Sequence, residues 1–468
     1  MKELSLGAPT GTAATSIGGQ TLHSLILSGP NGKGRKINQG LLADIWCEVS
    51  FLIVDEVSMV GAPFLDELLL RIRMGKGADP SNREKPFGGI NVIFMGDFGQ
   101  LEPAKQYSLF SHKLVKNPSY SESRSSYGIE AMNGAFLWRL VSHVIELKKN
   151  VRQGNDLAYA SFLQRLRVRK CFKRKVPGQA DDEEYLNSRL LSKLQMQPEA
   201  LEKFWDAPII VGSRVVRDAL NARLVEYHAG RQGMEVSLYY SRDTVKRRTP
   251  SSSLQKLLWE IPSAKNFDAF GYIPMFIGMK VMVTENIAFD NGIVNGSEGT
   301  LVELKYEEFE GRRYATVAFV CIKGSGINAP GEEDSDVVPI FPSASSVQCT
   351  EIFHPELKTQ SFRRRQLPLI PAYAYTDYKS QGRTLERVIV DLATAHGQGA
   401  YVMLSRVKSL SGLIILRWFP SSKIYGTLSE DLRNELKRLK ELEITSTTQI
   451  TSQLNLGAEI NQRIEDTA

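Results

Sequence analysis

Phe51-Leu52-Ile53-Val54-Asp55-Glu56 is a run of four apolar residues that ends in two acids. A continuous apolar run predicts a strand buried on both faces, as in the parallel sheets of α/β proteins. The loops at the carboxyl ends of such strands hold ligands. Two acids there suit a nucleotide hydrolase, which needs carboxylates to hold Mg²⁺ and to polarise a water beside the γ-phosphate. Strands also end in acids that are only solvated, so the motif alone leaves both interpretations open.

A second strand-and-acid pattern begins at Val92–Met95 and continues as Gly96-Asp97-Phe98-Gly99-Gln100. The side-chain amide of Gln100 stands at the tip of this loop, where it can sense a γ-phosphate and relay its presence to another domain. The alternative is an ordinary β-turn built on Gly96 and Asp97.

Two more apolar runs, Leu4–Ala8 and Val144–Leu147, complete the pattern of the first 150 residues. Together the four runs predict a doubly wound parallel sheet. The first run leads into Ala8-Pro9-Thr10-Gly11-Thr12-Ala13-Ala14, where small residues and hydroxyls allow a nucleic-acid phosphate to approach closely. A tight strand-to-helix turn is the alternative.

A fourth element lies at Ala372–Leu385 and contains Tyr378-Lys379-Ser380-Gln381-Gly382. Its lysine, serine and glutamine offer phosphate contacts, and its tyrosine offers a face on which a base can stack. The run Tyr401–Val407 follows and contains Arg406, which suits an arginine finger. No single one of these residues decides the function.

The composition is that of an ordinary globular protein. The chain has 468 residues, of which 42% are hydrophobic and 24% are charged, so it can form sizeable cores in about three domains. Its formal net charge of +6 permits an acidic partner without requiring one. The four cysteines lack C-x-x-C spacing, and no stretch of about 18 apolar residues is present. We therefore expect a soluble, unsecreted protein of a reducing compartment.

The remaining segments predict further elements. The helical stretch Leu157–Lys203 includes a basic cluster at 165–175, which is either a solvated helix face or a DNA-facing surface. Turn signals from Tyr272 to about Phe319 predict a small β-rich barrel or insert, which a loop at Ala329–Ser346 follows. A capping box opens a helix from Thr427 to about Ile444, expected to pack on its own second domain or to bind a partner, with a loose polar tail beyond it.

In this order and at these separations, the motifs resemble the Pif-type (petite integration frequency) DNA helicases of the RecD-like branch of superfamily 1. The resemblance extends from Leu4 to about Leu416. Its most specific pieces are Ala8–Ala14, Asp55–Met59, Gly96-Asp97-Phe98 with Gln100, Arg152-Gln153, Val294–Ser297 with Gly299, Lys379–Gly382 and Leu404–Arg406. The family is known for ATP-driven 5′→3′ translocation on single-stranded DNA and for duplex unwinding, and related sequences form the helicase part of rolling-circle transposons.

The resemblance implies roles for individual residues. Asp55 binds Mg²⁺, and Glu56 is the general base for the attacking water. Gln100 senses the γ-phosphate, and Arg152 and Arg406 reach it across the interdomain cleft. The implied nucleotide-binding residues are Asp55, Gln100, Gly382 and Arg406. The implied DNA-binding residues are Thr10, His23, Thr376, Tyr378, Lys379 and Ser380.

The sequence also departs from the family. No G-x-x-x-x-G-K-[ST] phosphate loop occurs in it, and we expect a family member truncated at its N-terminus. The missing piece is one core strand, the loop and its helix, whose loss is expected to leave sheet edges and apolar helix faces uncovered. Smaller departures are Asp377-Tyr378, where an apolar residue and histidine are more usual, and the extra acid Glu102.

Together these observations predict an α/β protein with two RecA-like P-loop NTPase domains, the first incomplete, and a small β-barrel insert in the second. Residues 1–145 are expected to form the incomplete first domain. The expected later segments are 146–271 (start of the second domain, with the basic helical segment), 272–360 (β-rich insert and loop), 361–426 (remainder of the second domain) and 427–468 (C-terminal helix and polar tail).

The predicted function is that of an ATP-dependent DNA helicase, with ATP and Mg²⁺ as cofactors and with single-stranded DNA and duplex junctions as partners. The alternative is an ATP-independent, single-stranded-DNA-binding remnant of a mobile-element helicase. A separate polypeptide that supplies the phosphate loop is a third hypothesis, which no residue favours. The resemblance further implies a monomer that acts in the nucleus, or in mitochondria, in DNA repair, recombination and telomere maintenance.

Overall fold

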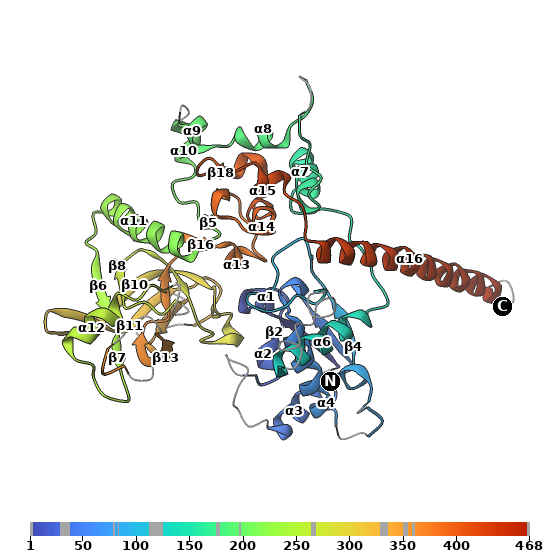
Figure 1. Ribbon diagram of the computed structural model, residues 1–468, viewed down its shortest axis with the longest axis horizontal. Coiled ribbons are helices and arrows are strands. Elements are labelled where there is room, and N and C mark those ends of the chain that lie inside the picture. The colour runs from blue at the N-terminus through green and yellow to red at the C-terminus, as the bar shows by residue number, and fades with distance from the viewer. Residues whose placement is uncertain are drawn as a thin grey trace. The chain divides into compact units, whose positions relative to one another are not determined.

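The computed structural model describes eleven stretches of the chain, and Figure 1 shows its elements. These stretches are residues 3–28, 38–77, 80–82, 84–111, 125–174, 178–195, 198–263, 268–327, 336–349, 354–357 and 361–465. The chain divides into two compact units, of which the first comprises residues 1–9, 17–172 and 424–468 and the second comprises residues 10–16 and 173–423. Among the described residues, no helix combines the length and the apolar character that a membrane span requires.

A four-stranded parallel sheet organises the first unit, with the strand order β2-β1-β3-β4. The strands are β1 (Leu4–Ala8), β2 (Gln20–Thr21), β3 (Phe51–Val54) and β4 (Asn91–Phe94). The strands predicted at Leu4–Ala8, Phe51–Val54 and Val92–Met95 are therefore confirmed, the last with a shift of one residue. Helices α2 (Leu22–Leu25), α3 (Gln39–Trp46), α4 (Ala62–Gly75), α6 (Ser126–Arg139) and α7 (Leu157–Arg167) accompany the sheet.

The strand predicted at Val144–Leu147 is not formed. Residues 141–150 have no regular secondary structure, and the side chains of Ile145 and Leu147 are 72% and 87% exposed. A strand needs a neighbour for its backbone hydrogen bonds, and no described strand lies beside this segment. It runs instead along α16 (Glu430–Glu465), where the Val144 N–H donates to Ser446 Oγ at 3.0 Å.

The two faces of the first sheet differ in their packing. Leu52 and Val54 on β3 are fully buried in the apolar core of the unit. On the other face, Phe51 of β3 and Ile93 of β4, which pairs with Ile53, are 45% and 48% exposed. Large apolar side chains are therefore exposed on this face of the sheet.

Helix α16 belongs to the first unit, which corrects the expectation that it packs on the second domain. Leu432, near its start, is 1% exposed and forms part of the first unit's core. The Trp138 indole donates to Glu435 Oε1 of the helix at 2.7 Å. The helix also continues to Glu465, so the tail after Thr445 is not loose. The polar composition of this tail argues against a buried core, but it does not argue against a helix. Serine and threonine hydroxyls in this part of α16 donate to backbone carbonyls one turn earlier.

The second unit contains a second parallel sheet with the strand order β16-β5-β17-β18. Its strands are β5 (Ile209–Val211), β16 (Ala374–Thr376), β17 (Val388–Asp391) and β18 (Leu413–Ile415). The helices of the unit are α1 (Gly11–Ser16), α8 (Asp182–Asn187), α9 (Leu191–Leu194), α10 (Pro198–Glu202), α11 (Arg214–Gln232), α12 (Ser252–Trp259), α13 (Asp377–Ser380) and α14 (Gly399–Ser405), while α15 (Ser422–Tyr425) spans the boundary of the two units. The α/β class is confirmed in both units.

The predicted β-rich insert is a mixed, barrel-like sheet. Its strand order is β15-β9-β10-β11-β6-β8, and β12 pairs with β11. The strands are β6 (Ser237–Tyr240), β8 (Tyr272–Met275), β9 (Lys280–Val283), β10 (Glu298–Phe309), β11 (Arg312–Cys321), β12 (Val337–Ile340) and β15 (Leu369–Pro371). The loop predicted at Ala329–Ser346 is wrong in part, because β12 and the start of β13 (Ser343–Gln348) fall within it. Val337, Val338 and Ile340 are buried, so apolar packing outweighs the local turn signals.

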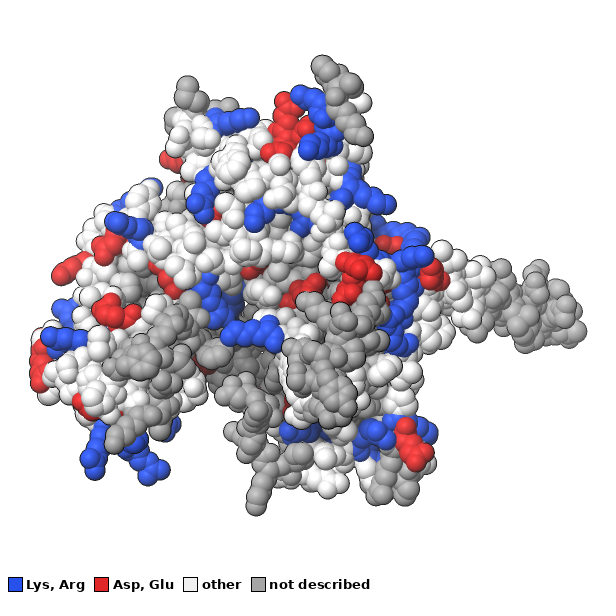
Figure 2. Space-filling view, viewed as in Figure 1, with Lys and Arg blue, Asp and Glu red and all other residues white. Residues whose placement is uncertain are grey.

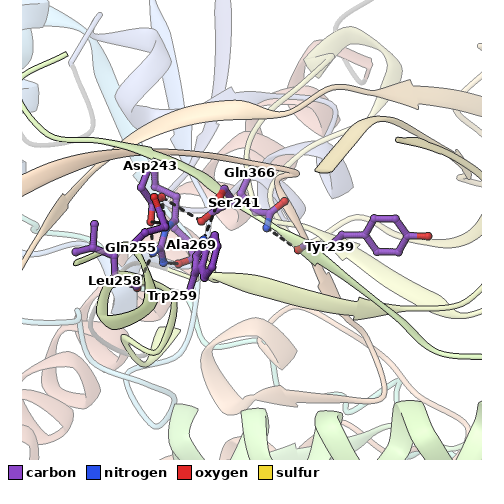
Figure 3. Close-up of polar contacts among 9 residues, drawn as sticks. Tyr239, Ser241, Asp243, Gln255, Leu258, Trp259, Ala269 and Gln366 are labelled. Carbon is purple, nitrogen blue, oxygen red and sulfur yellow. Dashed lines mark hydrogen bonds and ion pairs between the residues drawn. The ribbon is translucent and has the colours of Figure 1, made fainter. Parts of the chain in front are cut away.

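A buried ion pair joins a smaller three-stranded sheet to α12. This sheet has the order β13-β14-β7, with β14 at Ser361–Gln366 and β7 at Arg242–Thr244. Arg364 Nε and Nη2 donate to the two carboxylate oxygens of Asp243 at 2.9 and 2.8 Å, and both side chains are fully buried. Arg364 also donates to the carbonyls of Leu258 and Ala269, so the desolvated guanidinium is well supplied with acceptors. Figure 3 shows Asp243, Leu258 and Ala269 close together in this cluster.

We expect Arg364→Ala to lower the free energy of unfolding by about 3–5 kcal/mol, because it leaves the Asp243 carboxylate buried without its cation. The neighbouring Arg363 is exposed on the same strand, so Arg363→Ala is a matched control that changes stability by less than about 0.5 kcal/mol. Urea denaturation followed by circular dichroism measures both. Equal effects of the two substitutions would show that the buried pair contributes little.

Candidate functional site

Two acids follow β3 in the first unit. The Asp55 N–H donates to the Gly7 carbonyl of β1 at 2.9 Å, which continues the parallel ladder. Asp55 Oδ1 accepts the Glu56 N–H at 2.8 Å, and this bond fixes the direction of the carboxylate. Glu56 is nearly buried and has a φ of 50°, a left-handed conformation that is costly for a residue with a side chain. The structure therefore holds this acid in a strained, defined position.

The loop after β4 lies directly against this pair. The Val57 N–H donates to the Met95 carbonyl at 2.9 Å, which joins the carboxyl ends of the two strands. Gly96 has a φ of 141°, and a Cβ there would lie 2.9 Å from the Val57 nitrogen. Only glycine permits this approach. The geometry thus brings the Asp55–Glu56 turn and the Gly96–Gln100 loop together at one edge of the sheet.

Asp97 has a structural role in this loop. Its Oδ1 accepts the Gly99 N–H at 2.7 Å, and the Gln100 N–H donates to the Asp97 carbonyl at 2.9 Å. This is the β-turn that the sequence offered as the alternative. Arg167 at the end of α7 donates to the same carboxylate oxygen at 2.8 Å. Gln100, whose side chain is half-buried, therefore lies on a loop that the Arg167–Asp97 ion pair ties to α7.

The two candidate arginines lie in different units. Arg152 belongs to the first unit, where it is half-buried in a turn beside the buried Gln153. Arg406 belongs to the second unit and is 2% exposed. Its guanidinium donates to the Val402 carbonyl at 2.9 Å and to Ser405 Oγ at 2.8 Å, so its own helix α14 holds it.

The candidate DNA-binding residues are also divided between the two units. His23 on α2 belongs to the first unit and is exposed, and its ring stacks on Phe64 with a centroid distance of 4.3 Å. Thr10 lies in the second unit, where its hydroxyl accepts the Ala13 N–H at the start of α1. The other candidates, Thr376, Tyr378, Lys379 and Ser380, lie at the end of β16 and on α13.

Three elements of the second unit meet at one turn of the barrel-like sheet. The Thr12 hydroxyl of α1 donates to the Asn295 carbonyl at 3.3 Å, and Lys379 of α13 donates to the Asn295 side chain. Arg383, in the turn after α13, donates to the Gly296 carbonyl at 2.5 Å. The sequence places Thr12, Asn295 and Gly296 within motifs but predicts no contact between them, and it predicts no role for Arg383. The Asn-Gly dipeptide was the available signal, because it marks a tight turn.

The burial of Ser380 differs from what is expected of a DNA-binding residue. It is fully buried, and its hydroxyl donates to the Asp377 carbonyl at 2.7 Å. Thr376 is also buried, in register with Val211 in the second sheet. Tyr378 is 37% exposed, which suits the stacking role predicted for it. Gly382 is exposed with a φ of 83°, which lets the chain turn sharply after α13.

Burial and neighbouring charges shift the pKa values of two residues on α13, Lys379 and Asp377. The pKa of Lys379 is lowered to about 8, chiefly by burial and also by the charges of Arg383, Arg217 and Arg214, while Asp268 opposes the shift. Burial raises the pKa of Asp377 to about 6. Figure 2 shows that basic and acidic side chains are interspersed over the visible face of the molecule.

Several side chains of the basic cluster at 165–175 have partners within the chain. Arg167 pairs with Asp97, and Arg165 donates to Ser161 and lies over the Phe172 ring. Arg174 pairs with Glu184, and Lys175 lies outside the described residues. These contacts favour the solvated-face interpretation for most of this segment.

The described residues thus form two parallel α/β sheets with acids at strand ends, and a barrel-like insert in the second unit. Residues 3–167 match the family model described as PIF1-like helicase. The predicted resemblance to Pif-type helicases is confirmed. The mouse ATP-dependent DNA helicase PIF1 is 28% identical over 425 residues, which cover 88% of this chain and 53% of that protein. The human protein of the same name is 28% identical over 429 residues, which cover 88% and 54%.

Solved structures show the same fold. The structure titled Pif1 helicase from Bacteroides in complex with ADP-AlF3 and ssDNA superposes with a TM-score of 0.63 at 22% identity, covering 95% of this chain and 88% of that one. Pif1 helicase from Candida albicans gives a TM-score of 0.59 at 23% identity, covering 94% and 89%. The prediction of two RecA-like domains with an insert is thereby confirmed as a fold. The chain spans about half the length of the curated mouse and human relatives.

Asp377 makes the stability of the chain depend on pH. A Cβ on Gly399 would lie 2.7 Å from Asp377 Oδ2, and the other carboxylate oxygen accepts the Tyr378 N–H at 2.9 Å. Because burial raises the folded-state pKa from 3.8 to about 6, the folded chain binds more protons than the unfolded chain between these values. The stabilising contribution of the protonated acid is therefore complete below pH 3.8 and is lost as the pH rises through about 6.

We expect Asp377→Asn to raise the free energy of unfolding at pH 7 by about 2–3 kcal/mol and to remove this pH dependence, because the amide is neutral and still accepts the Tyr378 N–H. Asp290 is exposed and supplies a control. Asp290→Asn is expected to leave the difference in the free energy of unfolding between pH 4 and pH 7 as it is in the parent chain. Urea titrations at the two pH values measure the effect. An unchanged pH profile in Asp377→Asn would refute the assignment.

Proposed function

We propose that this chain is the core of an ATP-dependent DNA helicase of the Pif type, which moves 5′→3′ along single-stranded DNA and unwinds duplexes. The observation that carries the proposal is the meeting of α1, the Asn295–Gly296 turn and α13 in the second unit, where Lys379 and the exposed Tyr378 lie on one short helix. A cation and an aromatic face are the two groups with which proteins hold single strands.

The relatives support the same assignment. The mouse and human relatives are named ATP-dependent DNA helicases, and one structural neighbour is titled as a complex with ADP-AlF3 and ssDNA. We carry this activity over to the present chain as a proposal, together with junction DNA as a partner and a nuclear or mitochondrial location. Roles in DNA repair, recombination and telomere maintenance are part of the same proposal.

The first unit supplies part of a nucleotide site. Carboxylate oxygens suit Mg²⁺, and Asp55 stands at the end of the sheet with its carboxylate oriented by the Glu56 N–H. We assign Asp55 to Mg²⁺, Glu56 to the attacking water and Gln100 to the γ-phosphate. The lysine and amide cradle of a phosphate loop does not occur in the 468 residues, so these groups alone do not complete an ATP site.

A second candidate function follows from this incompleteness. An ATP-independent protein that binds single strands would need only the second unit, whose candidate residues do not include the acids after β3. Both functions predict binding that weakens with salt, because phosphate contacts release counterions. They differ in the effect of nucleotide.

The test is the affinity of the full 468-residue chain for a fluorescent oligo-deoxythymidine, measured with and without a non-hydrolysable ATP analogue and Mg²⁺. The helicase proposal predicts that the analogue changes the Kd at least about threefold through Asp55, Glu56 and Gln100, and that Glu56→Gln reduces this change without weakening strand binding in the absence of nucleotide. Glu48→Gln, an exposed acid of the same unit, serves as the control that keeps the effect of the nucleotide.

A Kd for the single strand that is the same with and without the ATP analogue, in the absence of ATP hydrolysis, would overturn the helicase proposal for these residues. It would favour the ATP-independent binder. A chain that binds no single strand at all would overturn both candidates.

A further inference from the structure

The turn at Asn295–Gly296 is held rigidly within the barrel-like sheet. The Gly296 N–H donates to the Val283 carbonyl at 2.8 Å, and the Asn295 N–H donates to Asn286 Oδ1 at 2.9 Å. The Val294 N–H donates to Ser297 Oγ at 3.0 Å. With three of its backbone donors committed, the turn offers a fixed platform for side chains that approach it.

Helix α1 rests on this platform at van der Waals distance. Gly296 has a φ of 107°, and a Cβ there would lie 2.6 Å from Thr12 Oγ1. A Cβ on Gly11 would lie 2.7 Å from Val294 Cβ. The two glycines therefore set how closely the helix and the turn approach each other, and the Thr12 hydroxyl closes the contact on the Asn295 carbonyl.

Arg383 braces the same turn from the other side. Its guanidinium donates to the Gly296 carbonyl at 2.5 Å and pairs with Glu298 on β10. It also lies over the ring of the buried Tyr375, with 5.0 Å from the guanidinium carbon to the ring centroid. The planar guanidinium thus ties the turn after α13 to the turn of the barrel-like sheet.

Lys379 then reaches the exposed side of the turn. Its ammonium donates to Asn295 Oδ1, and Asn295 itself is exposed. An ammonium has three donors, so this contact leaves two N–H groups for a ligand. The basic residues whose charges act on Lys379 are Arg383, the exposed Arg214, and Arg217, which pairs with Asp218 and Asp268.

We propose that Asn295 is a positioning residue that holds the Lys379 ammonium against one backbone phosphate of a bound single strand, with Arg383 fixing the turn on which Asn295 stands. The inference rests on the proposed function, because it assumes that a single strand lies on this surface. Asn295 Oδ1 orients the lysine, and the lysine makes the phosphate contact.

The experiment measures the affinity of the full chain for oligo-deoxythymidine at several salt concentrations. Lys379→Ala is expected to weaken binding about tenfold and to reduce the slope of log K against log[salt] by about 0.7, the value for one phosphate on a single strand. Asn295→Ala is expected to reduce the slope by the same amount. The double variant is expected to bind no more weakly than Lys379→Ala, because the two residues act through one contact.

Two further variants separate positioning from folding. Asn291→Ala removes an asparagine that donates to the Ser325 carbonyl in a neighbouring loop at 3.0 Å, and it is expected to bind like the parent chain. Asn295→Asp keeps an acceptor for Lys379 but adds a negative charge, so it is expected to bind a phosphate strand more weakly than Asn295→Ala. A purely structural role would instead be rescued by aspartate.

An unchanged salt slope in Asn295→Ala, additive losses in the double variant, or rescue by aspartate would overturn the inference while leaving strand binding intact. A parent chain that binds no strand would overturn the proposed function and this inference together.

Discussion

The close approach of the Gly296 backbone to the Thr12 side chain is the constraint on which the second unit's candidate surface depends. At Gly296, where φ is 107°, a Cβ would be strained and would lie 2.6 Å from Thr12 Oγ1, so glycine allows α1 to lie this close to the turn. Residues 10–16 are far in sequence from the rest of the second unit, yet they are part of it. Together with the contacts of Lys379 and Arg383 to the same turn, this approach gathers three separate stretches of sequence into a single set of polar groups.

The first unit uses glycine in the same way for different chemistry. Gly96 lets the loop after β4 lie against the backbone that follows Glu56, and Glu56 itself stays in a left-handed conformation. Strain of this kind persists only where the surrounding hydrogen bonds determine the backbone, as those of Asp55 and Val57 do here. The backbone that carries the acids assigned to Mg²⁺ and water is thus fixed by its hydrogen bonds, whereas large apolar side chains are exposed on one face of the sheet.

Much of the fold could be predicted from the sequence, because buried strands read as apolar runs. The failures have physical causes. Val144–Leu147 has the composition of a strand, but no described strand lies beside it to accept its backbone hydrogen bonds. Composition alone does not show which segments lie next to each other in the fold. Ser380 looked like a phosphate ligand because hydroxyls often are, but its position on a four-residue helix turns it inward. Asn295 and Arg383 act through residues more than 80 positions away, which no local pattern reveals.

The central claim is that α1, the Asn295–Gly296 turn and α13 act as one surface that holds a single strand. Hydrogen exchange of the full chain with and without oligo-deoxythymidine tests it most directly. The account predicts that the amides of residues 10–16, 292–297 and 377–383 gain protection together when the strand binds. Protection confined to other segments, or to only one of these three, would contradict it.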